Sequence, residues 1–342
     1  MALAYPIRTE RYIPGPAQGL ALMAFVLFYV LLGALRFETG GDWLTYGEMF
    51  DEIQSESLLY AVTTTDPLYG VINWMSAQLG TGIYLVNGIC CFVLGYGAVR
   101  AALTTREPWL ALLIAVPYLL IVVGLGYVRQ GAAIGVILIA ISSIDRSRPL
   151  RTIVYLVIAT LLHSSAAMAV PLFGYALIKR NRAFAIVAMV VGALMFVTLL
   201  APRLNQFEIG YIDTEYESSG AGIRLLMGLV PSLLILARYR RFASSARTRS
   251  IWIAISIANL MAGVALLISA SSTLVDRVAL YFSIVQLAAF GDIRDLLGIS
   301  NRMTFFLRIL LIAIAAAVQT VWLVYATHSI YWVPYQSILQ NL

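Results

Sequence analysis

The stretch from Thr152 to Ile178, TIVYLVIATLLHSSAAMAVPLFGYALI, decides how this chain folds. Basic residues flank it on both sides: Arg146, Arg148 and Arg151 before it, and Lys179, Arg180 and Arg182 after it. Loops rich in Lys and Arg tend to remain cytoplasmic. If both flanks are cytoplasmic, the chain enters the bilayer, turns near His163, Ser164 and Ser165, and returns. The pattern therefore predicts two short or broken helices.

The composition of the whole chain is that of a membrane protein. Of its 342 residues, 61% are hydrophobic and 12% are charged, against roughly a quarter charged in soluble domains. A hydrocarbon core of about 30 Å requires apolar helices of about twenty residues. The sequence excludes a soluble enzyme and predicts a single all-α, polytopic transmembrane domain over residues 1–342, with about eleven transmembrane helices. Its apolar blocks are Gly19–Leu35, Gly82–Val99, Trp109–Val128, Gly131–Ile144, Thr152–Ile178, Phe184–Ala201, Ile223–Ala237, Ile251–Ala270, Arg277–Phe290 and Met303–Ala326.

The distribution of charge predicts the orientation. With the amino terminus inside, 18 of the 23 basic residues fall in inside segments, whereas 12 of the 17 acids fall outside. The positive-inside tendency therefore predicts a cytoplasmic amino terminus and an extracytoplasmic carboxyl terminus. The net charge of +6 serves topology, because the arginines lie in short loops, and we expect no nucleic-acid binding. The basic residues left at the outside ends are Arg36, Arg129, Arg203, Arg224 and Arg277.

Two segments on the predicted outer side are long enough to hold a site. Residues 37–81 are acidic at first, and Asp66 to Trp74 then reads as a short helix lying at the membrane interface. Residues 202–222 are polar and end in Ser218-Ser219-Gly220-Ala221-Gly222, which predicts a flexible loop. We expect the functional site on this face.

The outer arginines are the first candidates for chemistry. An arginine at mid-membrane costs about 2.5–3.5 kcal/mol on insertion scales, so a partner is expected. The planar guanidinium matches phosphate and carboxylate. Arg129 and Arg277 begin apolar blocks and Arg224 follows the glycine-rich stretch, so together they are predicted to clamp a lipid diphosphate. In the alternative reading, Arg277 pairs with Asp276, Arg36 with Glu38, and Arg129 with lipid headgroups.

His163 and Asp42 are the other candidates. The imidazole of His163, at the predicted turn, is suited to take a proton from an attacking hydroxyl. The alternative is a histidine bonded to backbone carbonyls freed at a helix break. Asp42 lies in Gly40-Gly41-Asp42-Trp43, where glycines allow close approach of a ligand and the aromatic ring suits a sugar. No cluster has the spacing of metal ligands, and we expect no metal and no cofactor.

Taken in order along the chain, these residues resemble the EpsG family of Wzy-like polysaccharide polymerases. Asp66 and Trp43 depart from the glutamate and tyrosine common in the family, and both keep the chemical character. The resemblance rests on Arg36 followed by Gly41-Asp42-Trp43 and Tyr46; Asp66-Pro67-Leu68-Tyr69 with Asn73; Arg129-Gln130; His163-Ser164-Ser165-Ala166; Arg277 with Tyr281; and Pro334-Tyr335.

The resemblance implies a bacterial glycosyltransferase of the cytoplasmic membrane. Such an enzyme joins oligosaccharide repeat units carried on undecaprenyl diphosphate into exopolysaccharide, capsule or O-antigen at the outer face, and releases lipid diphosphate. Its partners would be the lipid-linked donor and acceptor and the bilayer, with a flippase and a chain-length regulator. We predict catalytic roles for His163, Asp42, Arg129 and Arg277, and substrate binding by Arg36, Arg224, Trp43, Tyr46, Asp66, Tyr69, Asn73, Gln130 and Tyr281.

Two other functions fit the same residues. The broken helices and buried arginines suit a transporter or flippase of an anionic or lipid-linked substrate, although the sequence has no inverted repeat. Another membrane glycosyltransferase, or an O-antigen ligase, would share the arginines and the base and differ in its acceptor. The residues alone do not separate these from a polymerase.

Overall fold

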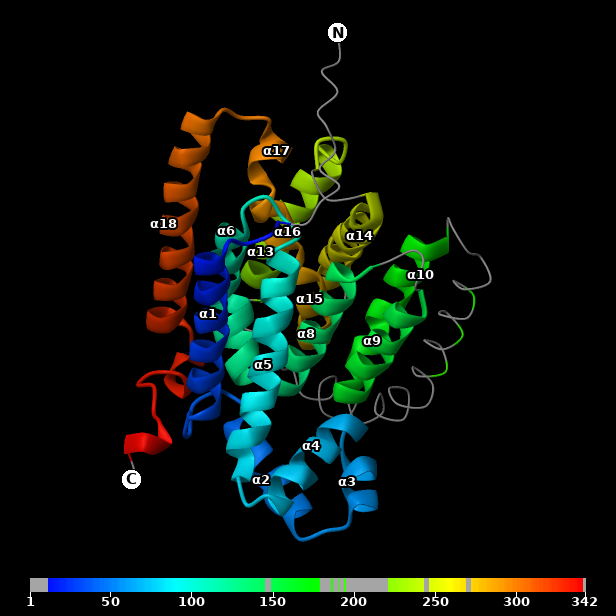
Figure 1. Ribbon diagram of the computed structural model, residues 1–342, viewed down its shortest axis with the longest axis vertical. Coiled ribbons are helices and arrows are strands. Elements are labelled where there is room, and N and C mark those ends of the chain that lie inside the picture. Colours follow the sequence, from blue (N-terminus) through cyan, green and yellow to red (C-terminus); the bar gives the residue numbers. More distant parts are fainter. Residues whose placement is uncertain are drawn as a thin grey trace.

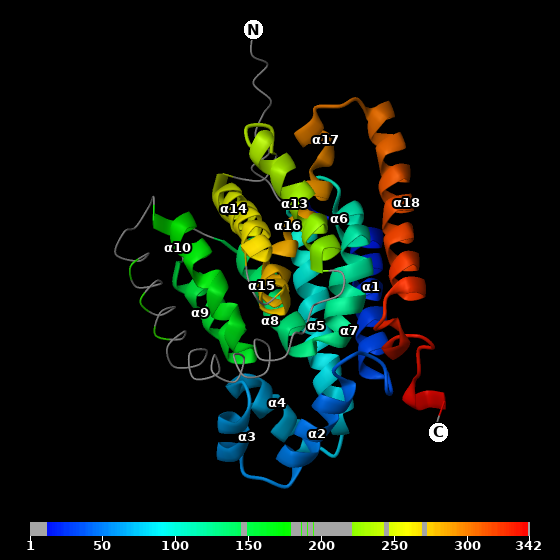
Figure 2. The same cartoon turned by 180° about the vertical axis from the view of Figure 1, so that it is seen from behind.

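The computed structural model describes residues 12–144, 149–178, 186, 190, 194, 221–242, 246–268 and 272–340. Over these residues the chain is all-helical and contains no strand, apart from one isolated antiparallel bridge between Arg36 and Ser337. The long helices run along the vertical direction of Figures 1 and 2. The predicted all-α class is confirmed.

Five helices in the described residues are long and apolar enough to cross a membrane: Pro16–Ala34, Gly82–Ala102, Pro108–Gly126, Thr248–Leu267 and Asn301–Tyr325. Shorter apolar helices occupy Val128–Ser142, Leu150–Leu162, Ser164–Gly174, Arg224–Ala237 and Arg277–Gly291. The protein is therefore a multi-pass membrane protein. The count of about eleven helices stays a prediction, because the block Phe184–Ala201 lies almost wholly outside the described residues. The predicted loop 202–222 also lies outside them, except for its last two residues.

The helix break predicted at His163 is present. Helix α9 (Pro149–Leu162) ends there, and His163 itself is extended, with φ −157° and ψ 115°. A 3₁₀ segment, η2 (Ser164–Ala169), follows and leads into α10 (Val170–Ile178). Helices α9 and α10 run side by side in both views (Figures 1 and 2). The turn carries His163 to the end of the molecule at which the residue 43–78 helices lie.

A second break precedes Arg129. Helix α6 (Pro108–Ala115) continues into a π-helical segment, η1 (Val116–Val123), and a short helix, α7 (Gly124–Gly126). Pro117 has no N–H to donate, which favours a change of hydrogen-bonding pattern here. Tyr127, with φ −122° and ψ 61°, separates this run from α8 (Val128–Ser142). Arg129 therefore lies in the first turn of a new helix.

The segment 37–81 is more helical than the sequence suggested. We predicted a loop with one interfacial helix, whereas the structure has three helices, α2 (Trp43–Gln54), α3 (Leu58–Thr64) and α4 (Pro67–Gln78). Ser57 caps α3 by accepting a bond from the N–H of Tyr60 at 3.2 Å, and Pro67 starts α4 at a position that tolerates proline. These helices cover one end of the molecule (Figure 1).

Helix α5 (Gly82–Ala102) lies at the centre and packs against α1 (Pro16–Ala34) and α8. Small residues permit its close contact with α8, since a Cβ on Gly97 would meet the carbonyl oxygen of Gly135 at 2.2 Å. A second group packs beside it, formed by α13 (Ala221–Ala237), α14 (Ala246–Ile268), α15 (Ser272–Ser283) and α16 (Val285–Gly291). The chain finishes with α17 (Ile293–Leu297), α18 (Asn301–Tyr325), η4 (Ser329–Tyr331) and η5 (Ile338–Gln340).

The two ends of the bundle carry different sets of charges. At the α17 end, Arg106 Nε lies 2.7 Å from Asp295, and Arg308 Nε lies 2.6 Å from Glu107. All four residues were predicted on the inside, and they do share one end. The carboxyl-terminal tail lies at the opposite end (Figure 1). Which end faces the cytoplasm stays a prediction.

Candidate functional site

The centre of the candidate site is the carboxylate of Asp66, which is completely buried. Its Oδ2 accepts from Arg129 Nη1 at 3.3 Å and lies 3.0 Å from His163 Nδ1. Its Oδ1 accepts from the backbone N–H of Ser164 at 3.0 Å. One carboxylate thus joins α4, the start of α8 and the break after α9.

The position of Asp66 in α4 explains its availability. Asp66 is the N-cap residue of α4, where an aspartate side chain usually bonds a backbone N–H of its own helix. Here that bond is absent, and the carboxylate reaches η2 and α8. It also accepts from the backbone N–H of Ser164 at the start of η2, a buried group that a membrane protein must satisfy internally. Asp66 therefore holds the turn as well as the histidine.

His163 is only partly buried, with 19% of its side chain exposed. Because Asp66 accepts the bond, the neutral ring donates from Nδ1 and keeps Nε2 as its basic nitrogen. The sequence leaves open whether this histidine bonds backbone carbonyls or acts chemically. Its partner is a carboxylate, an arrangement that orients an imidazole in many acid–base sites.

Arg129 is enclosed by protein groups. Its Nη1 also donates to the Thr65 hydroxyl at 3.1 Å, and its guanidinium lies over two rings, 5.4 Å from the centroid of Tyr46 and 5.5 Å from that of Tyr69. The side chain is 21% exposed. In place of the lipid headgroups of the alternative reading, Arg129 forms an ion pair with Asp66. Burial raises the pKa of Tyr46 to about 12, so its hydroxyl stays protonated at neutral pH.

Arg277 lies on α15 and is held there by contacts with the start of α8 and with Tyr127. Its guanidinium stacks over the ring of Tyr127 at 4.4 Å, and its backbone oxygen accepts from Gln130 Nε2 at 2.8 Å. Gln130 is buried, so its amide ties the start of α8 to α15. The alternative partner Asp276 has a side chain outside the described set. These contacts fix Arg277 beside Tyr127, the residue that separates α7 from α8.

Asp42 is half-buried at the N-cap of α2, and its environment joins the two arginines. Burial raises the pKa of the Asp42 carboxyl, while the positive charges of Arg277 and Arg129 oppose the rise. Both arginines therefore lie within electrostatic reach of one carboxyl group. The charge of His163 also acts on the Asp42 carboxyl group and opposes the rise of its pKa. Asp42 therefore lies within electrostatic reach of the other three residues predicted to be catalytic.

Arg36 has a structural environment. It is completely buried, donates to the backbone oxygen of Leu125 and, at 2.8 Å, to that of Thr39, and bonds Asn87 Oδ1 at 3.1 Å. Its guanidinium lies 5.2 Å from the ring centroid of Trp43. These contacts position the loop before α2, and the predicted contact of Arg36 with substrate stays a prediction. Gly40 is required there, because its φ of +110° and the close approach of Arg36 leave no room for a Cβ.

The other predicted substrate contacts divide into two groups. Trp43 is half-buried and contacts the ring of Tyr84 at 6.4 Å. The second group is buried in the protein interior and comprises Tyr46, Tyr69, Asn73 and Tyr281. Arg224 lies in the first turn of α13, partly buried, and α13 packs against α15, which carries Arg277.

Sequence reasoning missed Thr65 and Tyr127, and it named Ser165 only as part of the turn and the motif at His163. Thr65 bonds Arg129, Tyr127 lies under Arg277, and the Ser165 hydroxyl lies 3.0 Å from that of Tyr281. Thr65 and Tyr127 each stand within two positions of a predicted residue, which was the available signal. No group of three or more His, Cys, Asp or Glu side chains suited to a metal is found among the residues that the structure describes.

The sequence profile of the EpsG family matches residues 20–337, nearly the whole chain. The match includes every residue of the site described above. Searches of curated proteins and of solved structures found no match.

Proposed function

The chain belongs to the EpsG family, whose members are membrane proteins of the exopolysaccharide polymerase type, and from this premise we propose that it joins lipid-linked oligosaccharide repeat units. The donor and acceptor are glycans carried on undecaprenyl diphosphate. The reaction is a glycosyl transfer at the end of the bundle that carries Asp66. By the charge distribution of the loops, that end faces the outside of a bacterial cytoplasmic membrane.

In the proposed step, an acceptor hydroxyl oxygen attacks the anomeric carbon of the donor sugar. A new carbon–oxygen bond forms, the bond to the diphosphate oxygen breaks, and the hydroxyl proton passes to His163 Nε2. The leaving group is the lipid diphosphate, which takes the bonding electrons. Atoms and charge balance without a nucleotide, a metal or an oxidant.

The observation that carries this proposal is the shared carboxylate of Asp66. It holds His163 through Nδ1, at 3.0 Å, and leaves Nε2 as the proton acceptor. The ion pair with Arg129, at 3.3 Å, favours the ionised form of Asp66 and so the tautomer that the reaction needs. A packing histidine would not require a fully buried, charged partner, which costs free energy to desolvate.

The arginines supply the second part of the catalysis. Negative charge increases on the diphosphate as the bond to the sugar breaks, and fixed positive groups lower the barrier to that step. Arg277 is held by Tyr127 and Gln130, and Arg129 by Asp66 and two tyrosines. Arg224 would join them as a third cation. Because their positions are fixed before substrate binds, little reorganisation is needed.

Asp42 and Trp43 complete the proposal on the acceptor side. The carboxyl of Asp42 would accept hydrogen bonds from sugar hydroxyls, and the Trp43 ring would lie against a sugar face. Both are half-buried, and both lie at the start of α2, beside the arginines.

The test is reconstitution of the purified protein with an undecaprenyl-diphosphate-linked repeat unit. We expect a ladder of longer glycans together with released undecaprenyl diphosphate. A single addition to a different acceptor would identify a ligase or another transferase instead. Movement of the lipid-linked glycan across vesicles without new glycosidic bonds would identify a transporter and contradict the proposal.

A further inference from the structure

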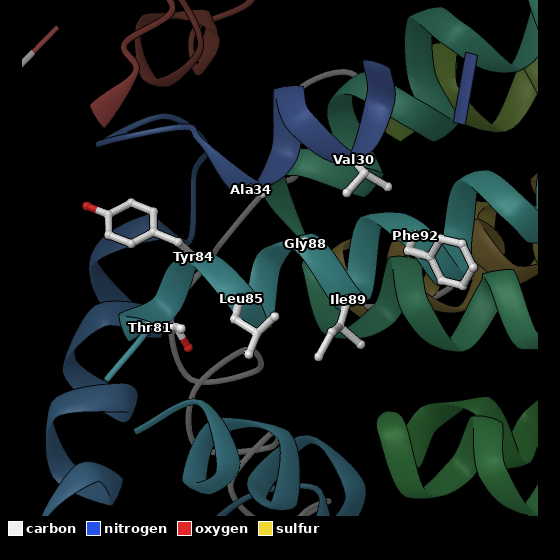
Figure 3. A pocket seen from close by; sticks show the side chains of 8 residues that line it. All are labelled: Val30, Ala34, Thr81, Tyr84, Leu85, Gly88, Ile89 and Phe92. Carbon is white, nitrogen blue, oxygen red and sulfur yellow. The ribbon is translucent and has the colours of Figure 1, made fainter. Parts of the chain in front are cut away.

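An apolar groove lies between α1 and α5, two of the candidate membrane spans. Its volume is about 580 Å³, within the range of roughly 300–1,000 Å³ typical of ligand sites. The lining is almost entirely hydrocarbon (Figure 3). It comprises Val30, Ala34, Thr81, Tyr84, Leu85, Gly88, Ile89 and Phe92.

The packing of α1 on α5 forms the groove. Gly88 lacks a side chain, and a Cβ built on it would lie only 3.2 Å from that of Ala34, so the two helices approach closely there. Leu85, Ile89 and Val30 also line the groove, and Figure 3 shows their side chains near this contact. Tyr84 to Phe92 covers about 12 Å of helix at 1.5 Å per residue. The groove is thus elongated along the span, as a chain-like ligand requires.

The environment selects a hydrocarbon occupant. Only 17% of the most apolar window of α1 is buried inside the protein, so its remaining surface faces lipid. Water does not fill an apolar groove within the hydrocarbon layer, and the available molecules there are lipid chains. An acyl chain of an ordinary phospholipid and the chain of a polyprenyl lipid share this chemistry.

Continuity with the candidate site favours the polyprenyl chain. Near the start of α5 the groove is lined by Thr81 and Tyr84, and the ring centroid of Tyr84 lies 6.4 Å from that of Trp43. Trp43 follows Asp42, on which the charges of Arg277 and Arg129 act. A lipid whose diphosphate lies at these arginines would leave the site past Trp43 and enter the groove at Tyr84. A phospholipid has no diphosphate that would align it with these arginines.

We propose that the groove between α1 and α5 binds the isoprenoid chain of the polyprenyl diphosphate substrate. This inference rests on the proposed function and adds a tail subsite to it. The subsite fixes the lipid at two points, the diphosphate at the arginines and the chain between two helices. Binding energy from the unreactive chain would then help to orient the sugar.

The first test is photocrosslinking. A benzophenone amino acid replaces Leu85 in the groove or, as the control, Leu27, which is 60% exposed on α1 and lies outside the groove. The purified proteins are placed in phosphatidylglycerol vesicles containing undecaprenyl diphosphate and irradiated, and the adducts are identified by mass spectrometry. We expect polyprenyl adducts at position 85 and phospholipid adducts at position 27. Phospholipid adducts alone at position 85 would overturn the proposal.

A second variant separates this inference from the proposed function. Ile89→Trp fills the groove and Leu27→Trp adds the same ring on the lipid-facing surface. We expect Ile89→Trp to lower both the polyprenyl adduct and polymerisation about tenfold, equivalent to 1.4 kcal/mol of binding, and Leu27→Trp to change neither. Equal activity of both variants and wild type would reject the groove while leaving the polymerase intact. An inactive wild type would instead reject the proposed function.

Discussion

Ion pairs occur at both ends of this bundle, but they are built differently. At the α17 end, Arg106 and Arg308 each meet their own carboxylate, and their side chains are 35% and 47% exposed. At the α4 end, one carboxylate without any exposure is shared by Arg129, His163 and a backbone N–H. The first arrangement joins helices at a surface, where a pair contributes about 0–1 kcal/mol.

Burying the charges of the second arrangement costs free energy, so a contribution to stability does not account for it and a chemical role is favoured. Desolvating a charge costs several kcal/mol, and a buried ion pair is often no more stabilising than apolar residues of the same volume. Asp66 fixes the tautomer of His163, orders the helix break and restrains Arg129. The comparison teaches that the number of ion pairs does not distinguish the two ends, whereas a buried carboxylate shared between a histidine and an arginine is found at the α4 end and favours it as the candidate site.

The largest effect is expected from Asp66→Asn. The amide has the same shape but no charge, so it leaves Arg129 without its counter-ion. It also keeps only one acceptor oxygen for the three groups that now donate to Asp66, namely Arg129, His163 and the N–H of Ser164. We expect polymerisation to fall at least about 100-fold and the free energy of unfolding by about 3–5 kcal/mol. Ladder formation and thermal unfolding in detergent measure both. A variant with more than half of wild-type activity would contradict the role of Asp66.

His163→Ala tests the base separately from the fold. Loss of a general base typically lowers the rate about 10²- to 10⁴-fold. Because the side chain is partly exposed, we expect a smaller change in stability than for Asp66→Asn. The rate is measured under single-turnover conditions with the lipid-linked donor. Full activity would remove His163 from the mechanism and leave its bond to Asp66 as a purely structural contact.

Arg129→Lys keeps the charge but loses the planar fork that contacts Asp66, Thr65 and two aromatic rings. We expect about a tenfold loss of kcat, since a fixed cation in the transition state becomes a mobile one. Arg308→Lys is the matched control at the other end and should keep wild-type activity. Equal activity of the two variants would show that Arg129 acts only through its charge.

Asp42 gives a prediction for pH. An exposed aspartate has a pKa of about 3.9. Burial raises the pKa of Asp42, so Asp42 takes up a proton at a higher pH than an exposed aspartate does. If the carboxylate binds the acceptor, affinity for the acceptor should fall as the pH drops towards that raised pKa. Asp42→Asn should lose this acidic limb, weaken acceptor binding about tenfold, and leave stability at neutral pH unchanged or slightly higher, because the raised pKa means that burial disfavours the charge. An unchanged pH profile would contradict the assignment.

The smallest effect is expected from Asp295→Asn. Its pair with Arg106 is partly exposed, so we expect a loss of about 0–1 kcal/mol in unfolding free energy and no change in activity. Added salt should reduce the difference in unfolding free energy between this variant and wild type, because salt screens exposed charges. Thermal unfolding at increasing salt concentrations measures this. A loss of activity as large as that of Asp66→Asn would show that both ends participate in function and would remove the contrast between them.

The sequence by itself determined the membrane class, the helical architecture and the break at His163. These follow from local properties: the length of apolar runs, the position of basic residues, and polar residues in the middle of an apolar block. The sequence also indicated Asp42, Arg129, His163 and Arg277 as chemical residues, because charged groups near a bilayer must have a reason to be there.

Only the tertiary structure decided which groups surround these residues. Asp66 is predicted to bind sugar, and the structure buries its carboxylate between Arg129 and His163, residues that lie far from it in the sequence. Arg36 resembled the other arginines and is enclosed by carbonyl groups and Asn87. Local sequence cannot distinguish these cases, because a side chain's role depends on which distant groups reach its polar atoms and on how much water remains around them. Those two quantities exist only once the helices are packed.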